Sequence, residues 1–93
     1  MNIGHAIKVC RSARGLTLKD LAERVGVTAS YLSMLEKNDR EPSLSTINSI
    51  AKALEVPTPI IMFFASDKDE LSGLDDATSS RLSEAAIKVM RAL

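Results

Sequence analysis

The sequence is poor in cysteine, histidine and aromatic residues, and each shortage excludes a class of protein. Cys10 is the single cysteine and His5 the single histidine. One cysteine cannot form an intramolecular disulfide and fits a reducing compartment. Because no other cysteine or histidine stands at ligand spacing, no metal site is predicted. We expect Cys10 to pack inside the protein as a small apolar side chain, the alternative being a redox switch.

Net charge and long apolar runs are also missing. Twelve basic and twelve acidic residues balance over the 93 positions, so overall charge gives no argument for nucleic-acid binding. Residues 1–56 hold eight basic and six acidic residues, a net +2, whereas residues 57–93 hold four and six, a net −2. No apolar run approaches the length of a membrane span, and Lys8, Arg11 and Arg14 argue against a signal peptide. We therefore expect no membrane association.

Catalytic residues are not evident either. The sequence shows no paired carboxylates, no nucleophile with a matching base and no glycine-rich loop that would cradle a phosphate. We therefore expect neither enzymatic activity nor a bound cofactor. A length of 93 residues suits one domain with a modest core and one appended element.

Apolar residues at helical spacing are what the sequence has in quantity. The i, i+3, i+4, i+7 pattern predicts five helices and one more near the C-terminus, the first five beginning near Ile3, Thr17, Thr28, Ser43 and Thr58. Gly15, Gly26 and Asn38 suit the left-handed position that follows a helix. With only three aromatic residues, the composition also favours a small all-α protein over a sheet.

Several details of these helices can be predicted. Thr17 is expected to cap the second helix with Asp20 in its first turn, and Thr58 to cap the fifth with Pro59 in its first turn. The fourth helix should present one apolar stripe to the core, made of Leu44, Ile47, Ile50, Ala51 and Leu54. Residues 60–64, IIMFF, are too many apolar residues for one helix face, so another segment must cover part of the run.

A tight corner joins the second and third predicted helices. Only Gly26 and Val27 separate them, which forces a steep crossing. In the third helix Leu32 and Leu35 face inward, and the remaining side chains are small or unbranched at Ala29, Ser30, Ser33 and Met34. An ordinary surface helix has no need of such short side chains. They suit a helix face that enters a groove.

Short motifs in register along residues 3–64 point to a family. They are Ile3-Gly4, Ile7, Arg11, GLT at 15–17, LA at 21–22, GV at 26–27, YLS at 31–33, LE at 35–36, PS at 42–43 and IAKALEV at 50–56. Together they resemble the lambda-repressor/Cro-like helix-turn-helix family, the xenobiotic-response-element type of bacterial and phage repressors. The resemblance implies an all-α fold in which five helices form the DNA-binding domain, with the C-terminal helix as an addition.

The resemblance also implies which residues contact double-stranded DNA. The helix from Thr28 would lie in the major groove, with Ala29, Ser30 and Met34 at base edges and Thr28 and Tyr31 nearer the phosphates. The full set of expected DNA-binding residues is Thr17, Leu18, Thr28, Ala29, Ser30, Tyr31, Ser33, Met34, Lys37, Asn38 and Arg40. By the same resemblance, Arg11 and Glu36 would form a structural ion pair that holds the angle of this helix.

Two residues depart from the family pattern. Leu18 stands where relatives usually carry glutamine, and Met34 replaces a polar base reader. Neither side chain makes the hydrogen bonds of the usual residue, so direct base reading is expected to be sparse. Specificity would then depend more on Lys37, Arg40, DNA shape and half-site spacing.

The C-terminal apolar residues lie beyond the resemblance. We expect residues 1–66 to form the helix-turn-helix domain and residues 67–93 to form a connector and a C-terminal helix for dimerisation. The predicted homodimer contacts are Ile60, Ile61, Phe64, Leu82, Ala86, Val89, Met90 and Leu93. The alternative is that this helix folds over residues 60–64 of its own chain.

The function predicted from these features is sequence-specific binding of double-stranded DNA. The chain is expected to be a cytoplasmic transcriptional regulator, bacterial or phage-encoded, that represses as a homodimer on a palindromic operator. The alternative is an antitoxin or protein-interaction module whose C-terminal half binds a protein partner while the helix-turn-helix regulates its own gene.

Overall fold

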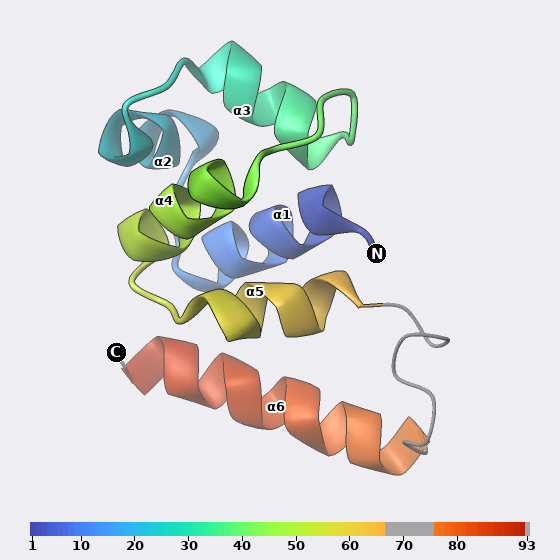
Figure 1. The fold of residues 1–93 in the computed structure, drawn as a ribbon. Helices are drawn as coiled ribbons and strands as arrows, with labels where there is room; N and C mark the ends of the chain where they lie inside the picture. The colour runs from blue at the N-terminus through green and yellow to red at the C-terminus, as the bar shows by residue number, and fades with distance from the viewer. Residues whose placement is uncertain (67–75, 93) are drawn as a thin grey trace.

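Helices account for all the regular secondary structure in the described part of the chain, which covers residues 1–66 and 76–92 of a computed structural model. They are α1 (Ile3–Ala13), α2 (Leu18–Val25), α3 (Ala29–Glu36), α4 (Leu44–Leu54), α5 (Thr58–Ala65) and α6 (Asp76–Ala92). The predicted all-α fold, with five helices and an additional C-terminal one, is confirmed. In Figure 1, α3 and α6 lie on opposite sides of the molecule, with α1, α4 and α5 between them.

Most helix ends follow the capping residues that the sequence offers. The Thr17 hydroxyl accepts a hydrogen bond from the Asp20 amide at 3.0 Å, and the Asp20 carboxylate accepts one from the Thr17 amide at 3.1 Å. These two bonds form a capping box, which satisfies two N–H groups that the helix leaves unpaired. Hydrogen bonding of the Asp20 carboxylate to the Thr17 backbone N–H first, and then to the Thr17 side chain, lowers the pKa of Asp20.

Two predictions about the later helices are wrong. Thr58 does not cap α5, because Pro57 occupies the cap position without a side-chain bond, and the Thr58 hydroxyl instead donates to Asn48 Oδ1 at 2.9 Å. Leu44 does not face the core, since 66% of it is exposed. It is the first residue of α4, one turn before Ile47, where the buried face of the helix begins.

The hydrophobic core is formed by the first five helices. Its buried residues are Ala6, Ile7, Cys10, Leu21, Ala22, Leu32, Leu35, Ile47, Ile50, Ala51, Leu54, Val56, Ile61 and Ala65. The prediction that Cys10 packs as an apolar residue is confirmed, and burial raises the pKa of its thiol to about 11. Ala86 of α6 is also buried, at 7% exposed, but is not part of this cluster. Helix α6 therefore lies against a core that the first five helices form.

Candidate nucleic-acid interface

The corner between α2 and α3 is built by backbone geometry and one cap. Gly26 ends α2 with φ of 88°, a left-handed conformation that glycine adopts without strain. The amides of Gly26 and Val27 both donate to the carbonyl oxygen of Ala22, at 2.9 and 3.0 Å. The Thr28 hydroxyl then accepts a hydrogen bond from the Tyr31 amide at 3.0 Å and starts α3. This corner fixes the direction in which α3 begins relative to α2.

Helix α3 has one face in the core and one towards solvent. Leu32 and Leu35 are buried, at 0 and 1% exposed. Ala29 and Ser30 are exposed, and Ser33 and Met34 are partly buried. The first turn thus presents a methyl and a hydroxyl group, so no long side chain at these two positions stands between the helix backbone and a surface docked against it.

Basic residues follow the end of α3. Lys37 and Arg40 are exposed, and the guanidinium carbon of Arg40 lies 5.8 Å from the centre of the Tyr31 ring. That distance is within the range of a cation–π contact, which restrains a long and otherwise mobile side chain. Tyr31 itself is partly buried and packs against the core. The pair places one positive charge beside the solvent face of α3.

The remaining predicted DNA-binding residues are placed differently from one another. Thr17 and Thr28 are exposed at the starts of α2 and α3, where N–H groups favour anions. Leu18 is partly buried and packs against the core, so much of its side chain serves the protein interior. Asn38 is exposed, but its side-chain amide is hydrogen-bonded to Gly4 and Asn2 of the α1 end.

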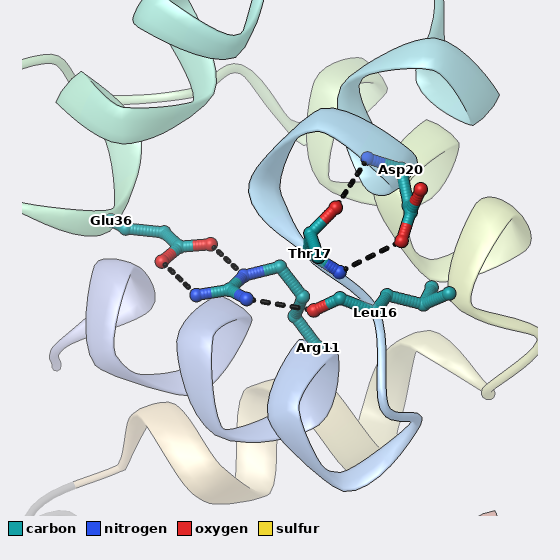
Figure 2. Close-up of polar contacts among 5 residues, drawn as sticks. All are labelled: Arg11, Leu16, Thr17, Asp20 and Glu36. Carbon is teal, nitrogen blue, oxygen red and sulfur yellow. Dashed lines mark hydrogen bonds and ion pairs between the residues drawn. The ribbon is translucent and has the colours of Figure 1, made fainter.

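Helix α3 is joined to α1 by the ion pair of Arg11 and Glu36. Arg11 Nε donates to Glu36 Oε2 at 2.8 Å, and Nη2 donates to Glu36 Oε1 at 3.1 Å (Figure 2). Arg11 Nη1 also donates to the carbonyl oxygen of Leu16 at 2.8 Å. The Glu36 hydrogen bonds raise the pKa of Arg11 further above its usual value. One arginine therefore ties together α1, the end of the α1–α2 turn and the end of α3.

The sequence analysis did not predict two other contacts, one at the end of α3 and one at the end of α4. The Gly4 amide donates to Asn38 Oδ1 at 3.1 Å, and a Cβ atom at Gly4 would lie 2.5 Å from the Leu35 carbonyl oxygen. Arg14 Nε donates to the Leu54 carbonyl oxygen at 2.7 Å and so caps α4. A glycine in the first turn of a helix was an available signal for the first contact, since it suggests close approach of another backbone.

The predicted dimerisation residues divide by exposure. Ile61 is fully buried and Ala86 is 7% exposed, so the chain itself covers both. Ile60 and Phe64 are partly buried, and Leu82 is 43% exposed. Leu93 lies outside the described residues, as do the side chains of Val89 and Met90. Ile60, Phe64 and Leu82 are therefore the members of the predicted set that a second copy would reach in this conformation.

An apolar groove separates α5 from α6. It has a volume of about 330 Å³ and is lined by Pro59, Ile60, Phe63, Leu82, Ala85 and Ala86. Figure 1 shows α6 running alongside α5 in the opposite direction. Helix α6 also contacts α1. The C-terminal helix thus packs on its own chain and leaves part of the apolar surface of α5 open.

Neither a membrane-spanning helix nor a metal-binding cluster was found in the described ranges, 1–66 and 76–92. None of those helices is both long enough and apolar enough to cross a bilayer. Within the same ranges, no three histidine, cysteine, aspartate or glutamate side chains are grouped as metal ligands.

Comparisons with known proteins give the family. Residues 7–61 match the family model described as helix-turn-helix. The chain is 39% identical over 62 residues to the immunity repressor protein of Bacillus phage phi105, an alignment that covers 67% of this chain and 43% of that protein. It is 36% identical over 69 residues to the HTH-type transcriptional regulator SinR of Bacillus licheniformis, covering 73% of this chain and 60% of SinR.

A solved structure agrees with these relatives. The crystal structure of the clp gene regulator ClgR from C. glutamicum superposes with a TM-score of 0.68 and 30% sequence identity, over 80% of this chain and 92% of that one. All three relatives are named as regulators or a repressor. The family model alone covers more than half of the chain, so the chain belongs to the helix-turn-helix family.

Proposed function

We propose that this chain is a bacterial or phage transcriptional regulator that acts in the cytoplasm as a dimeric repressor of a palindromic operator. The observation that carries the proposal is the solvent face of α3, where Ala29 and Ser30 are exposed on a corner fixed by Gly26 and Thr28. A major groove about 12 Å wide admits a helix, and short side chains let its backbone approach the base edges. The immunity repressor and SinR support a role in regulating genes.

Phosphate binding in this proposal does not need a basic chain. The capped ends of α2 and α3 present backbone N–H groups with a partial positive charge, and Lys37 and Arg40 add two exposed cations at the far end of α3. The backbone N–H groups and the two basic side chains all lie on α2, on α3 or just after α3. A local footprint is therefore compatible with zero net charge, and affinity should fall as salt concentration rises.

The proposal is tested by selecting bound fragments from random DNA duplexes and then changing α3. We expect one sequence class to be enriched, and Ser30→Glu to abolish its binding because a carboxylate would face the DNA phosphates and bases. Ser80→Glu is the matched control, since Ser80 is exposed on α6, on the side of the molecule opposite α3. Equal binding by the wild type and Ser30→Glu would refute docking through α3.

Dimerisation follows from the number of bases that one α3 helix can reach. A single short helix contacts few base pairs, whereas two copies related by a two-fold axis read two half-sites about 34 Å apart. Leu82, 43% exposed beside the open part of the α5–α6 groove, offers a contact for the second copy. The selected sequences would then be inverted repeats with a spacing close to one helical turn.

The same groove favours one alternative function, a protein-interaction module. An apolar groove lined by Ile60, Phe63 and Leu82 is able to hold an apolar helix from a different protein. In that case the chain would be an antitoxin-like protein that regulates its own gene. Sedimentation of the purified chain separates the two functions, since a homodimer forms without any partner and a partner-dependent complex does not.

A further inference from the structure

Two asparagine side chains connect the start of α1 to the end of α3. Asn38 Oδ1 accepts a hydrogen bond from the Gly4 amide at 3.1 Å, and Asn38 Nδ2 donates to Asn2 Oδ1 at 2.8 Å. Asn2 Oδ1 also caps α1 by accepting from the His5 amide at 2.9 Å. Backbone amides only donate, so the atoms facing Gly4 and His5 must be oxygens, which fixes the direction of the Asn38–Asn2 bond. We call these three hydrogen bonds the asparagine latch.

The backbone of Asn38 alone does not explain an asparagine at this position. Asn38 follows the α3 cap residue Lys37 with φ of 61°, a left-handed conformation that glycine adopts at lower cost. A position that required only this turn would be best filled by glycine. The asparagine side chain, however, makes two hydrogen bonds that glycine lacks. The side chain therefore has a role beyond the turn.

The latch lies where α1 and α3 approach each other closely. A Cβ atom on Gly4 would lie 2.5 Å from the Leu35 carbonyl oxygen and 2.6 Å from that of Glu36. The amide of Asn2 also donates to the Ala65 carbonyl oxygen at 2.6 Å, so the residue that accepts from Asn38 is itself fixed to the end of α5. The latch thus connects α3 to a rigid point rather than to a loose terminus.

The end of α3 is held at two separated points along α1. The latch holds it at residues 2–4, and the ion pair holds it at Arg11. Seven helical residues span about 10 Å at 1.5 Å per residue. On α3 the two contacts lie at Glu36 and just beyond it at Asn38, so they restrain the end of a helix whose Leu32 and Leu35 are already packed in the core.

We propose that Asn2 and Asn38 are positioning residues for DNA recognition, because the latch that they form fixes the angle at which α3 meets the groove. This inference rests on the proposed DNA-binding function. Asn38 was predicted from the sequence to contact DNA. Here it acts on DNA binding through Gly4 and Asn2.

The first test is Asn38→Gly, measured with the selected duplex at a temperature where circular dichroism shows the variant fully folded. Glycine suits the left-handed backbone but removes both side-chain bonds, so we expect affinity to fall about tenfold. Residual dipolar couplings of the α3 amides relative to those of α4 should change as well. Unchanged affinity and couplings would mean that Asn38 serves only the turn, which overturns the proposal.

Variants of Asn2 separate positioning from a direct Asn38–DNA contact. Asn2→Ser keeps an oxygen that caps α1 but is too short to reach Asn38, so affinity should fall, though less than in Asn38→Gly, because the Gly4–Asn38 bond remains. Asn2→Asp keeps an acceptor for both bonds and should bind nearly as the wild type does. If Asn38→Gly weakens binding and Asn2→Ser does not, the Asn2–Asn38 bond does not position α3 and the proposal is wrong.

These experiments also separate a failure of this inference from a failure of the proposed DNA-binding function. A wild-type chain that binds no duplex refutes DNA binding, and the inference with it. A wild-type chain that binds a selected duplex, with all three variants binding equally well, refutes only the latch. If Asn38→Gly does not fold, Asn2→Ser and Asn2→Asp still decide the question, because both keep the α1 cap and the Asn38 backbone.

Discussion

The guanidinium of Arg11 binds the carboxylate of Glu36 in a bidentate arrangement, with N–O distances of 2.8 and 3.1 Å. Their side chains are only 13 and 7% exposed, so little water screens the pair. The ion pair crosses from α1 to the last residue of α3 and therefore links the stability of the fold to the direction of α3. Removing one partner should cost more than removing both, because the remaining charge would stay buried without its partner.

The first prediction is a double-mutant cycle on this pair. We expect Arg11→Met and Glu36→Leu each to lower the free energy of unfolding by about 3 kcal/mol, and the double variant to lose less than either. Urea unfolding provides the measurement. The pair of Arg14 and Glu55 is the control, since the Glu55 side chain is 69% exposed and Glu55→Gln should cost less than about 1 kcal/mol. Additive losses at Arg11 and Glu36 would contradict a coupled pair.

The second prediction concerns Gly4. In most helix positions glycine to alanine stabilises a protein by about 1 kcal/mol. At Gly4 a Cβ atom would lie 2.5 and 2.6 Å from two backbone carbonyl oxygens of α3, which cannot rotate away as a side chain can. We expect Gly4→Ala to destabilise the protein by about 2 kcal/mol in urea unfolding.

Ser12→Ala is the control for Gly4→Ala, because Ser12 is exposed on the same helix. It should change stability by no more than about 0.5 kcal/mol. A Gly4→Ala variant as stable as this control would show that α1 and α3 do not approach as closely as described.

The third prediction concerns base reading by Ala29. Its methyl group is exposed in the first turn of α3 and suits contact with the C5 methyl of thymine. Replacing the contacted thymine of a selected duplex by uracil removes that methyl group and should weaken binding about fourfold. Ala29→Gly should bind thymine and uracil duplexes equally. Equal binding of both duplexes by the wild type, at every thymine of the half-site, would exclude methyl recognition.

The secondary structure was readable from the sequence because local signals set it. Thr17 with Asp20, Gly26, Thr28 and Ser43 mark helix ends through bonds to residues within three or four positions. Where the predictions failed, at Thr58 and Leu44, the local pattern permitted two outcomes. A threonine before proline suits a cap position, but the Thr58 hydroxyl donates to Asn48, ten residues earlier in the chain.

The candidate interface was less predictable because its support is not local. Arg11 and Glu36 are 25 residues apart, and their pairing was expected only because motifs elsewhere in the chain resemble a family. Asn38 lies 34 residues from Gly4, and nothing in the spacing of apolar residues indicates that bond. The burial of Leu18 likewise depends on its packing against the core. The spacing of apolar residues in one helix indicates its buried face, but not the long-range contacts that orient the helix relative to its neighbours.

The fourth prediction is a pH dependence of stability from Cys10. Burial raises the pKa of its thiol from 9.0 to about 11 in the folded protein. Between these values the unfolded chain loses the proton and the folded chain keeps it, so the stabilisation is complete below pH 9 and is lost as pH rises towards 11. The difference in unfolding free energy between the wild type and Cys10→Ala should therefore shrink between pH 8 and pH 10.5. A constant difference would mean that the thiol ionises equally in both states.

The last prediction tests whether the open part of the α5–α6 groove meets a second copy. Leu82→Asp places a charge beside Ile60 and Phe63, where solvent now reaches an apolar surface. We expect this variant to sediment as a monomer, because burying an unpaired carboxylate in an apolar contact costs several kcal/mol. Leu44→Asp is a matched control, since Leu44 is 66% exposed at the start of α4 and should leave the dimer intact. A dimer that survives Leu82→Asp but not Leu44→Asp would move the proposed interface to α4.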